Sequence, residues 1–135
     1  MNTRISKLGI SALVAAVALA GGLALNAEQP TVKRNVVMKE ELSIPGREGV
    51  MAMVELPPGS AEGKHTHLAE VFAFVQEGTI SLELEGKPTV TLKAGDVFHI
   101  PQGKVHQAIN KGTVTAKLVA FFVAEKGKPL TTPVK

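Results

Sequence analysis

The sequence predicts an all-β fold, a single small barrel or sandwich that follows an N-terminal export segment. Three observations lead to this prediction. Short segments rich in β-branched and aromatic residues recur after residue 30, and Gly or Pro turns separate them. Helical periodicity is absent beyond the first 27 residues. The chain has 135 residues, which is the length of one domain.

Residues 1–27 have the pattern of a secretory signal helix. Two basic residues open the segment, and residues 8–25 are uncharged and rich in Ala, Leu and Val. Small residues follow, so we expect cleavage after Ala27. The mature chain is then one β-barrel domain over residues 28–135, located in the periplasm or secreted.

Two alternatives remain open for this segment. Cleavage after Ala24 also fits the small-residue pattern. An uncharged run of about 18 residues is at the lower limit of membrane-spanning length, so an uncleaved inner-membrane anchor with the domain facing the periplasm is the second alternative. The pair Gly21-Gly22 interrupts such a helix and favours a cleaved signal, which leaves the mature protein without a membrane partner.

Charge and composition exclude several classes of function. The formal net charge is +3, and Arg4 and Lys7 belong to the signal, so the mature domain keeps 13 basic and 12 acidic side chains. A near-neutral surface predicts no nucleic-acid partner. The chain has no Cys, which excludes disulfides, a thiol nucleophile and a Cys zinc site. It also has no Trp and no Tyr, so Tyr cannot act as a general acid.

The first part of the mature chain predicts two strands and a turn-rich connection. Residues 31–42 carry β-branched side chains between charges, which is typical of an edge strand. Pro and Gly in residues 43–49 predict a loop, and the apolar run 50–56 predicts the next strand. Met51 and Met53 share one face of that strand and would either fill the core or line a pocket.

The middle of the chain predicts a strand followed by a hairpin. Residues 71–75 are strongly apolar, and Phe72 and Phe74 share a face that we expect in the core. Residues 79–85 alternate between apolar and polar, as a half-buried strand does. A Gly-Lys-Pro turn then leads into residues 89–92, which complete the hairpin.

The last part predicts three strands, over residues 97–100, 105–109 and 114–124. Phe121 and Phe122 are neighbours on the last of these. Adjacent strand residues face opposite ways, so one of them should face a pocket and the other should face away. The tail that follows is rich in Gly, Pro and Lys, and it predicts an extended, irregular segment.

The chemistry of the chain is concentrated in its histidines. His65 and His67 are two residues apart, so on a strand their rings point to the same face and can reach one metal ion. Two further histidines, His99 and then His106, follow the predicted hairpin. Imidazole suits Fe, Mn, Ni, Cu and Zn, and the spacing does not choose among these divalent metals.

Two stretches of the chain resemble the two motifs of the cupin family. The first motif is G-x5-H-x-H-x3/4-E-x6-G, and the chain matches it at Gly59, His65, His67 and Gly78. The second is G-x5-P-x-G-x2-H-x3-N, and the chain matches it at Gly95, Pro101, Gly103, His106 and Asn110. The resemblance covers residues 32–135 and implies a single-domain jelly-roll barrel, also called a double-stranded β-helix.

The resemblance implies a metal site formed by His65, His67 and His106, with Glu70 as fourth ligand. Glu70 departs from the pattern, because only two residues separate it from His67 and Val71 holds the position that the motif gives to glutamate. A bulge or a tighter turn could bring Glu70 to the histidines. Otherwise the alternation of the strand turns it away and leaves a three-histidine centre, with Glu70 as a carboxylate at the rim.

The resemblance also implies a function, namely a metal-dependent oxidoreductase of dioxygenase type acting on a small organic substrate. In that hypothesis Glu70 or His99 moves a proton. His99 could instead be an extra metal ligand, and it is otherwise a pocket or surface residue. The wall of the pocket is expected to consist of Met51, Met53, Phe74 and Phe122. The alternative is a non-catalytic periplasmic domain that binds a metal or a small ligand. A metal-free isomerase ranks below both, because such relatives use a Tyr acid.

The expected partner is therefore a small-molecule ligand or substrate. Small cupins also commonly pair through an edge strand. The segment 32–42 is the candidate edge, so a homodimer is an arrangement that the sequence allows without establishing it.

Overall fold

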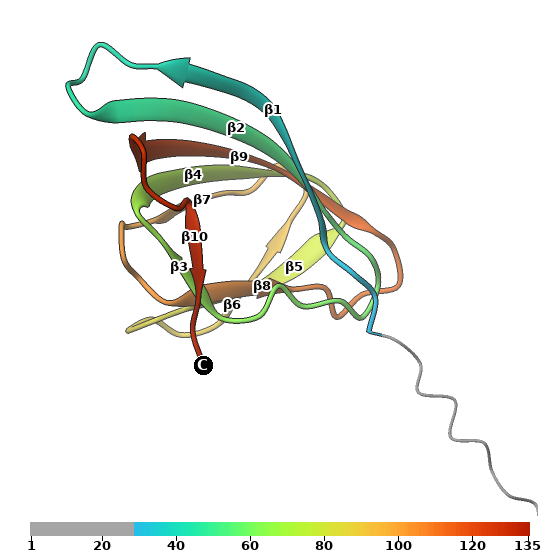
Figure 1. Ribbon diagram of the computed structural model, residues 1–135. Coiled ribbons are helices and arrows are strands. Elements are labelled where there is room, and N and C mark those ends of the chain that lie inside the picture. Colours follow the sequence, from blue (N-terminus) through green and yellow to red (C-terminus); the bar gives the residue numbers. More distant parts are fainter. Residues whose placement is uncertain (1–28) are drawn as a thin grey trace, which may run out of the picture.

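The computed structural model describes residues 29–135 of the protein (Figure 1). The predicted signal, residues 1–27, lies outside the described residues. The described part consists of ten strands: β1 (Lys33–Glu41), β2 (Arg47–Leu56), β3 (His65–His67), β4 (Ala69–Glu77), β5 (Thr79–Leu84), β6 (Val90–Lys93), β7 (Val97–Ile100), β8 (His106–Ile109), β9 (Ala116–Glu125) and β10 (Thr131–Pro133). Between residues 29 and 135 there is no helix with the length and apolar character needed to cross a membrane.

The strands form two five-stranded sheets that pack against each other. The first sheet has the order β1-β2-β9-β4-β7, and the second has the order β10-β3-β8-β5-β6. All pairs are antiparallel, and the predicted hairpin is β5 and β6, in which Ile80 pairs with Leu92. Figure 1 shows the first sheet as a curved upper layer with the second sheet beneath it. The prediction of an all-β jelly-roll barrel is confirmed.

The inward residues of the first sheet are small where they face the histidines. Along β2, β4 and β9 the buried positions alternate with exposed or half-buried ones. Ala52, Ala73 and Ala120 are buried side by side at the paired positions of these three strands. Small side chains leave space between the two sheets, so the barrel holds a pocket instead of a fully filled core.

Four residues expected inside the barrel lie on its outside. Phe72 and Phe74 are 51% and 43% exposed, and they occupy the outward positions of β4 on either side of buried Ala73. Met51 and Met53 likewise alternate with buried Ala52 and face outward from β2. The periodicity predicted which residues share a face but not which face is inside, and the interior takes the smaller residues.

The end of the second motif and the end of the first each depend on one particular residue. Asn110 is fully buried, and its Nδ2 donates to the carbonyls of Leu56 and Val114 at 2.8 Å each. Asn110 therefore fixes the turn that follows β8. Gly78 has a φ of +74°, and a Cβ there would lie 2.9 Å from the Ala116 Cα. Only glycine fits that position between β4 and β5.

The prediction of an irregular tail was wrong. Residues Thr131–Pro133 form β10, which pairs with β3 so that Thr131 lies opposite His67 and Pro133 lies opposite His65. β3 has only three residues, and β10 covers one of its edges while β8 pairs with the other. The end of the chain thus stabilises the strand that carries two of the histidines.

Candidate metal centre

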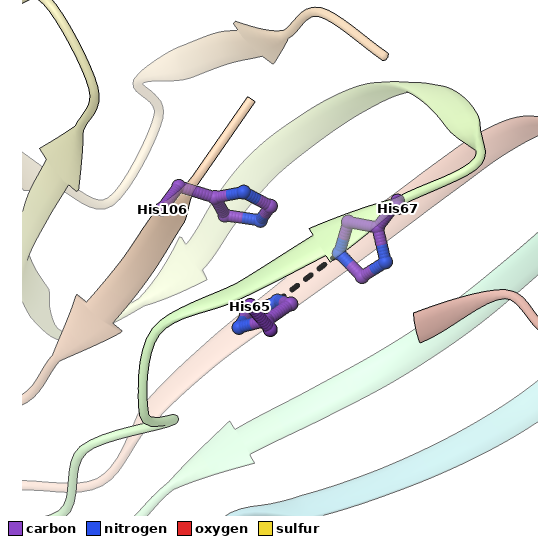
Figure 2. Close-up of side chains that lie close together, drawn as sticks. All are labelled: His65, His67 and His106. Atoms are coloured by element: carbon purple, nitrogen blue, oxygen red, sulfur yellow. Dashed lines mark hydrogen bonds between the residues drawn. The ribbon is translucent and has the colours of Figure 1, made fainter. Parts of the chain in front are cut away.

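Three histidines meet inside the barrel, as the sequence predicted. His65 and His67 both point inward from β3, and His106 points inward from the start of β8, where it is the cross-strand partner of His65 (Figure 2). All three are at most 6% exposed. Each offers one ring nitrogen to a group whose atoms all lie within 4.8 Å of one another. The three ring centroids are 4.3 to 4.9 Å apart.

The outer nitrogen of each ring is held by a backbone carbonyl. The Nδ1–H of His65 donates to Gly63 O at 2.8 Å, and that of His106 donates to Lys104 O at 2.9 Å. The Nδ1–H of His67 donates to Leu130 O at 3.0 Å, beside β10. A carbonyl only accepts, so each Nδ1 carries the proton and each Nε2 presents a lone pair to the centre of the group. Metal-binding histidines are commonly oriented by such hydrogen bonds from the ring nitrogen that does not bind the metal.

The inner nitrogens are arranged so that they can share a cation. The Nε2 atoms of His65 and His67 are 3.1 Å apart, which is the contact drawn in Figure 2. Two lone pairs at that distance repel unless a proton or a metal ion lies between them. Burial, with smaller contributions from the other histidines and Arg34, lowers the pKa of His67 from 6.5 to about 4. A proton is therefore disfavoured at neutral pH, and the donor set fits a metal ion, for which M–N distances of about 2.0–2.1 Å are usual.

Burial also lowers the pKa of His106, and the charge of Arg34 acts in the same direction, whereas the hydrogen bond to Lys104 O and the charge of Glu62 act against it. A histidine that binds a metal through Nε2 and keeps the proton on Nδ1 carries no charge. Three neutral ligands leave the full charge of a bound divalent ion in the pocket, which favours binding of an anion.

Glu70 and His99 lie outside this group. Buried positions continue in strict alternation from β3 into β4 through Ala69 and Val71, and the irregularity in the pairing of β4 comes only after Val75. No bulge corrects the early position of Glu70, so its carboxylate faces outward and the motif position points Val71 into the pocket. The structure therefore does not place Glu70 with the histidines as a fourth ligand.

Glu70 and His99 instead meet each other on the outer face of the first sheet. The His99 Nε2 lies 2.7 Å from the Glu70 Oε2, and the two side chains are 46% and 43% exposed. The ring of His99 also stacks on Phe72, with centroids 4.8 Å apart. Neither side chain lines the pocket that the three histidines share. The expectation that either one moves a proton at the metal does not fit this placement.

The pocket above the histidines is small and mostly apolar. It has a volume of about 90 Å³, and its walls include Val54, Val71, Leu118 and Phe122. Of the four wall residues expected from the sequence, Phe122 lines it and packs edge-on against His67 at 5.0 Å. Its neighbour Phe121 lies against the outer face of the sheet, so the prediction that these two phenylalanines face opposite ways is confirmed.

Three residues of the site were not predicted from the sequence. Leu130 orients His67 through its carbonyl, and Arg34 and Glu62 line the pocket. Glu62 lies in the first motif, three residues before His65, and that spacing was the one available signal. Arg34 reaches the site through the pairing of β1 with β2. Leu130 lies just before β10, which pairs with the distant strand β3.

The fold and the three-histidine group together define a small jelly-roll barrel with a candidate metal centre at one end of its interior. Residues 52–122 match the cupin domain family, and the chain belongs to this family. The matched range includes all three histidines. It excludes β1 and β10, which lie before and after it.

The chain is also similar to curated relatives in sequence and to solved structures in fold. The chain is 38% identical over 89 residues to germin-like protein subfamily 2 member 1 of Arabidopsis thaliana, an alignment that covers 60% of this chain and 41% of the relative. The chain spans less than half the length of the curated relatives it matches. A conserved protein of Klebsiella pneumoniae with a double-stranded β-helix domain superposes with a TM-score of 0.64 at 21% identity, over 81% of this chain and 87% of that one. An oxalate oxidase superposes with a TM-score of 0.58 at 26% identity, over 64% of this chain and 46% of that one.

Proposed function

We propose that this protein is an exported single-domain cupin that binds one divalent transition metal through His65, His67 and His106. We further propose that it acts there as an oxidoreductase of dioxygenase type on a small organic substrate. The observation that carries the proposal is the arrangement of the imidazoles: three Nδ1–H groups donate to carbonyls, and three Nε2 lone pairs converge in a buried pocket. The oxalate oxidase among the similar structures supports the oxidoreductase class.

The chain supplies three parts of this function. The histidines hold the ion and leave positions free for exogenous ligands, since the chain offers no carboxylate at the motif position. Val71, Leu118 and Phe122 keep water out of the pocket and so strengthen electrostatic interactions inside it. A bound first-row metal would supply Lewis acidity and, for Fe, Mn or Cu, redox chemistry.

A second candidate function is a non-catalytic periplasmic domain that binds a metal or a small ligand. The placement of Glu70 and His99 favours it, because the two residues expected to transfer protons lie on the outer face of the barrel. A binding domain needs only the ligands and the pocket. Turnover under air distinguishes the two functions.

Metal content is the first test. The protein is purified without a metal-binding tag and measured by elemental analysis beside the variants His65→Ala/His67→Ala and Glu70→Ala. We expect about one metal ion per chain in the wild type and in Glu70→Ala, and none in the double histidine variant. Wild-type protein that takes up no metal even after reconstitution would refute both the centre and the oxidoreductase. Oxygen uptake with small chelating organic acids then separates the enzyme from the binding domain.

Location and assembly complete the proposal. Residues 1–27 direct export, and the mass of the exported protein tests cleavage after Ala27 against Ala24 or retention as a membrane anchor. The partner is a small molecule and not a nucleic acid. β1 is the edge strand of the first sheet and all nine of its residues are exposed, which supports a homodimer through this edge. Sedimentation of the purified protein tests that arrangement.

A further inference from the structure

Two charged side chains line the histidine pocket, and neither holds one of the named positions of the two cupin motifs. These two residues are Arg34 and Glu62. The rest of the lining consists of the three histidines, Thr131 and apolar side chains. Arg34 lies on β1, outside the range 52–122 that matches the family. A cation that is close to a metal centre in an otherwise apolar pocket is a candidate for recognition of the ligand.

The contacts of Glu62 fix its position between Arg34 and the histidines. Its Oε2 accepts a hydrogen bond from the backbone N–H of Ala108 at 3.0 Å and lies 3.9 Å from the His65 Nε2. Its Oε1 lies 3.3 Å from the Arg34 Nη2. The Glu62 side chain is 11% exposed, whereas that of Arg34 is 42% exposed. Glu62 is thus the anchored partner, and the guanidinium retains solvent-facing donors.

Arg34 lies close to the histidine group. It lines the same pocket, and Glu62 bridges the two, with Oε1 at 3.3 Å from the Arg34 Nη2 and Oε2 at 3.9 Å from the His65 Nε2. Its positive charge is therefore close enough to act on a ligand that binds at the same nitrogen-lined end of the pocket. A divalent ion, one guanidinium and one carboxylate leave an excess of two positive charges there, which favours an anion.

We propose that Arg34 is a binding and specificity residue, and that the pocket takes a small carboxylate whose oxygens contact the metal on one side and the Arg34 guanidinium on the other. The planar fork of donors on arginine matches a carboxylate, which distinguishes it from a lysine at the same place. A cavity of about 90 Å³ restricts the ligand to a few carbon atoms. This inference names the substrate class of the proposed function and rests on that function.

Glu62 has the opposite effect on the same ligand. Its carboxylate occupies Arg34 before the ligand arrives, so the ligand must compete with it. Replacing Arg34 should therefore weaken anion binding, and replacing Glu62 by the neutral isostere Gln should strengthen it. A general loss of structure would lower the anion affinity in both variants, so opposite changes in affinity would point to the proposed roles.

The test titrates acetate and its neutral isostere acetamide into the full chain loaded with Co²⁺, by calorimetry and by the visible spectrum of the metal. The variants are Arg34→Gln, Arg34→Lys, Glu62→Gln and the control Arg47→Gln. Arg47 bonds Gln102 at 2.9 Å and does not line the pocket. We expect the Kd for acetate to rise about tenfold in Arg34→Gln, to fall in Glu62→Gln and to stay unchanged in Arg47→Gln. Acetamide should bind weakly and equally to all of them.

The failures of the two proposals are distinguishable. Equal acetate affinity in Arg34→Gln and wild type, with full metal content in both, would overturn the role of Arg34 and leave the metal centre standing. Rescue by Arg34→Lys to the wild-type affinity would contradict recognition by the guanidinium fork. If the wild type holds no metal, the proposed function fails, and the same titration on metal-free protein decides whether Arg34 still binds the anion.

Discussion

The barrel wall carries a group of three histidines on its inner face and a histidine–glutamate pair on its outer face. The two groups differ in burial and in what orients their side chains. Inside, three buried histidines are oriented by carbonyls, and their inner nitrogens converge. Outside, His99 and Glu70 form a half-exposed pair at 2.7 Å on the first sheet. The residue types are similar, and the position on an alternating strand decides between a candidate metal centre and a hydrogen-bonded pair on the surface. A one-residue difference in spacing therefore changes the chemistry of a glutamate completely.

Removing one inner histidine and one outer histidine should give the largest contrast. In His106→Ala the metal affinity should fall by more than about 100-fold, because loss of a ligand exceeds the 10–100-fold effect of losing a residue that merely orients one. In His99→Ala the affinity should stay within about twofold, since this side chain lies outside the pocket. Competition with a chromogenic chelator measures both constants. Comparable losses in the two variants would contradict the assignment of the faces.

The inner group should make the stability of the metal-free protein depend on pH. The pKa of His67 is about 4 in the folded protein, whereas the ordinary value of 6.5 applies in the unfolded chain. Between pH 6.5 and pH 4 the unfolded chain binds a proton that the folded chain does not, so the free energy of unfolding falls as the pH falls, by about 3 kcal/mol. Urea unfolding at pH 7 and pH 4 in the presence of a chelator measures this.

His67→Gln is the control for the pH dependence. This substitution removes the group with the lowered pKa. The free energy of unfolding of the variant should therefore depend much less on pH between pH 6.5 and pH 4. An unchanged slope in His67→Gln would mean that other groups dominate the acid sensitivity of the fold.

Moving the carboxylate from the outer face to the inner one should tighten metal binding. Val71 points into the pocket at the position where the motif has glutamate, so Val71→Glu adds an anionic ligand beside the three histidines. We expect the metal affinity to rise by about 10-fold, at some cost in the stability of the metal-free protein, because a buried carboxyl is unfavourable without the ion. Val71→Gln is the neutral control. Equal affinity of Val71→Glu and wild type would show that the position is out of reach of the ion.

The pair of Glu70 and His99 on the outer face should contribute little to the stability of the fold. A double-mutant cycle of Glu70→Gln and His99→Gln should give a coupling energy of about 0.2–1 kcal/mol, because both side chains are more than 40% exposed and solvent screens their interaction. Unfolding in denaturant at pH 6 gives the four free energies. A coupling well above 1 kcal/mol would indicate that another surface covers this face and shields the pair.

Sequence reasoning predicted the strands, the jelly-roll barrel and the three histidines, because these depend on local alternation and on short motifs. It placed Phe72, Phe74, Met51 and Met53 inside, where the structure has Ala52 and Ala73. Large apolar side chains are usually buried, but a barrel that keeps a pocket needs small residues on its inner face. Alternation also left the position of Glu70 open, and the absence of a bulge before Val71 decided it.

The contacts made by β1 and β10 could not be predicted in the same way. Arg34 meets Glu62 through pairing of β1 with β2, and Leu130 meets His67 although the two are 63 positions apart. Neither residue belongs to a recognisable motif. Pairing between distant segments is set by the whole chain, so a pattern within one segment carries no signal for it.

The hydrogen bond from His67 to Leu130 has a consequence for biosynthesis. His65 and His67 emerge from the ribosome long before residue 130, and until then the strand that carries them lacks its β10 neighbour and His67 lacks the carbonyl that selects its tautomer. A nascent chain that ends before residue 130 therefore contains the histidines but not the contacts that orient His67. In the proposed function, metal would therefore bind only after synthesis has passed residue 130, and the ion would be selected in the compartment where folding ends.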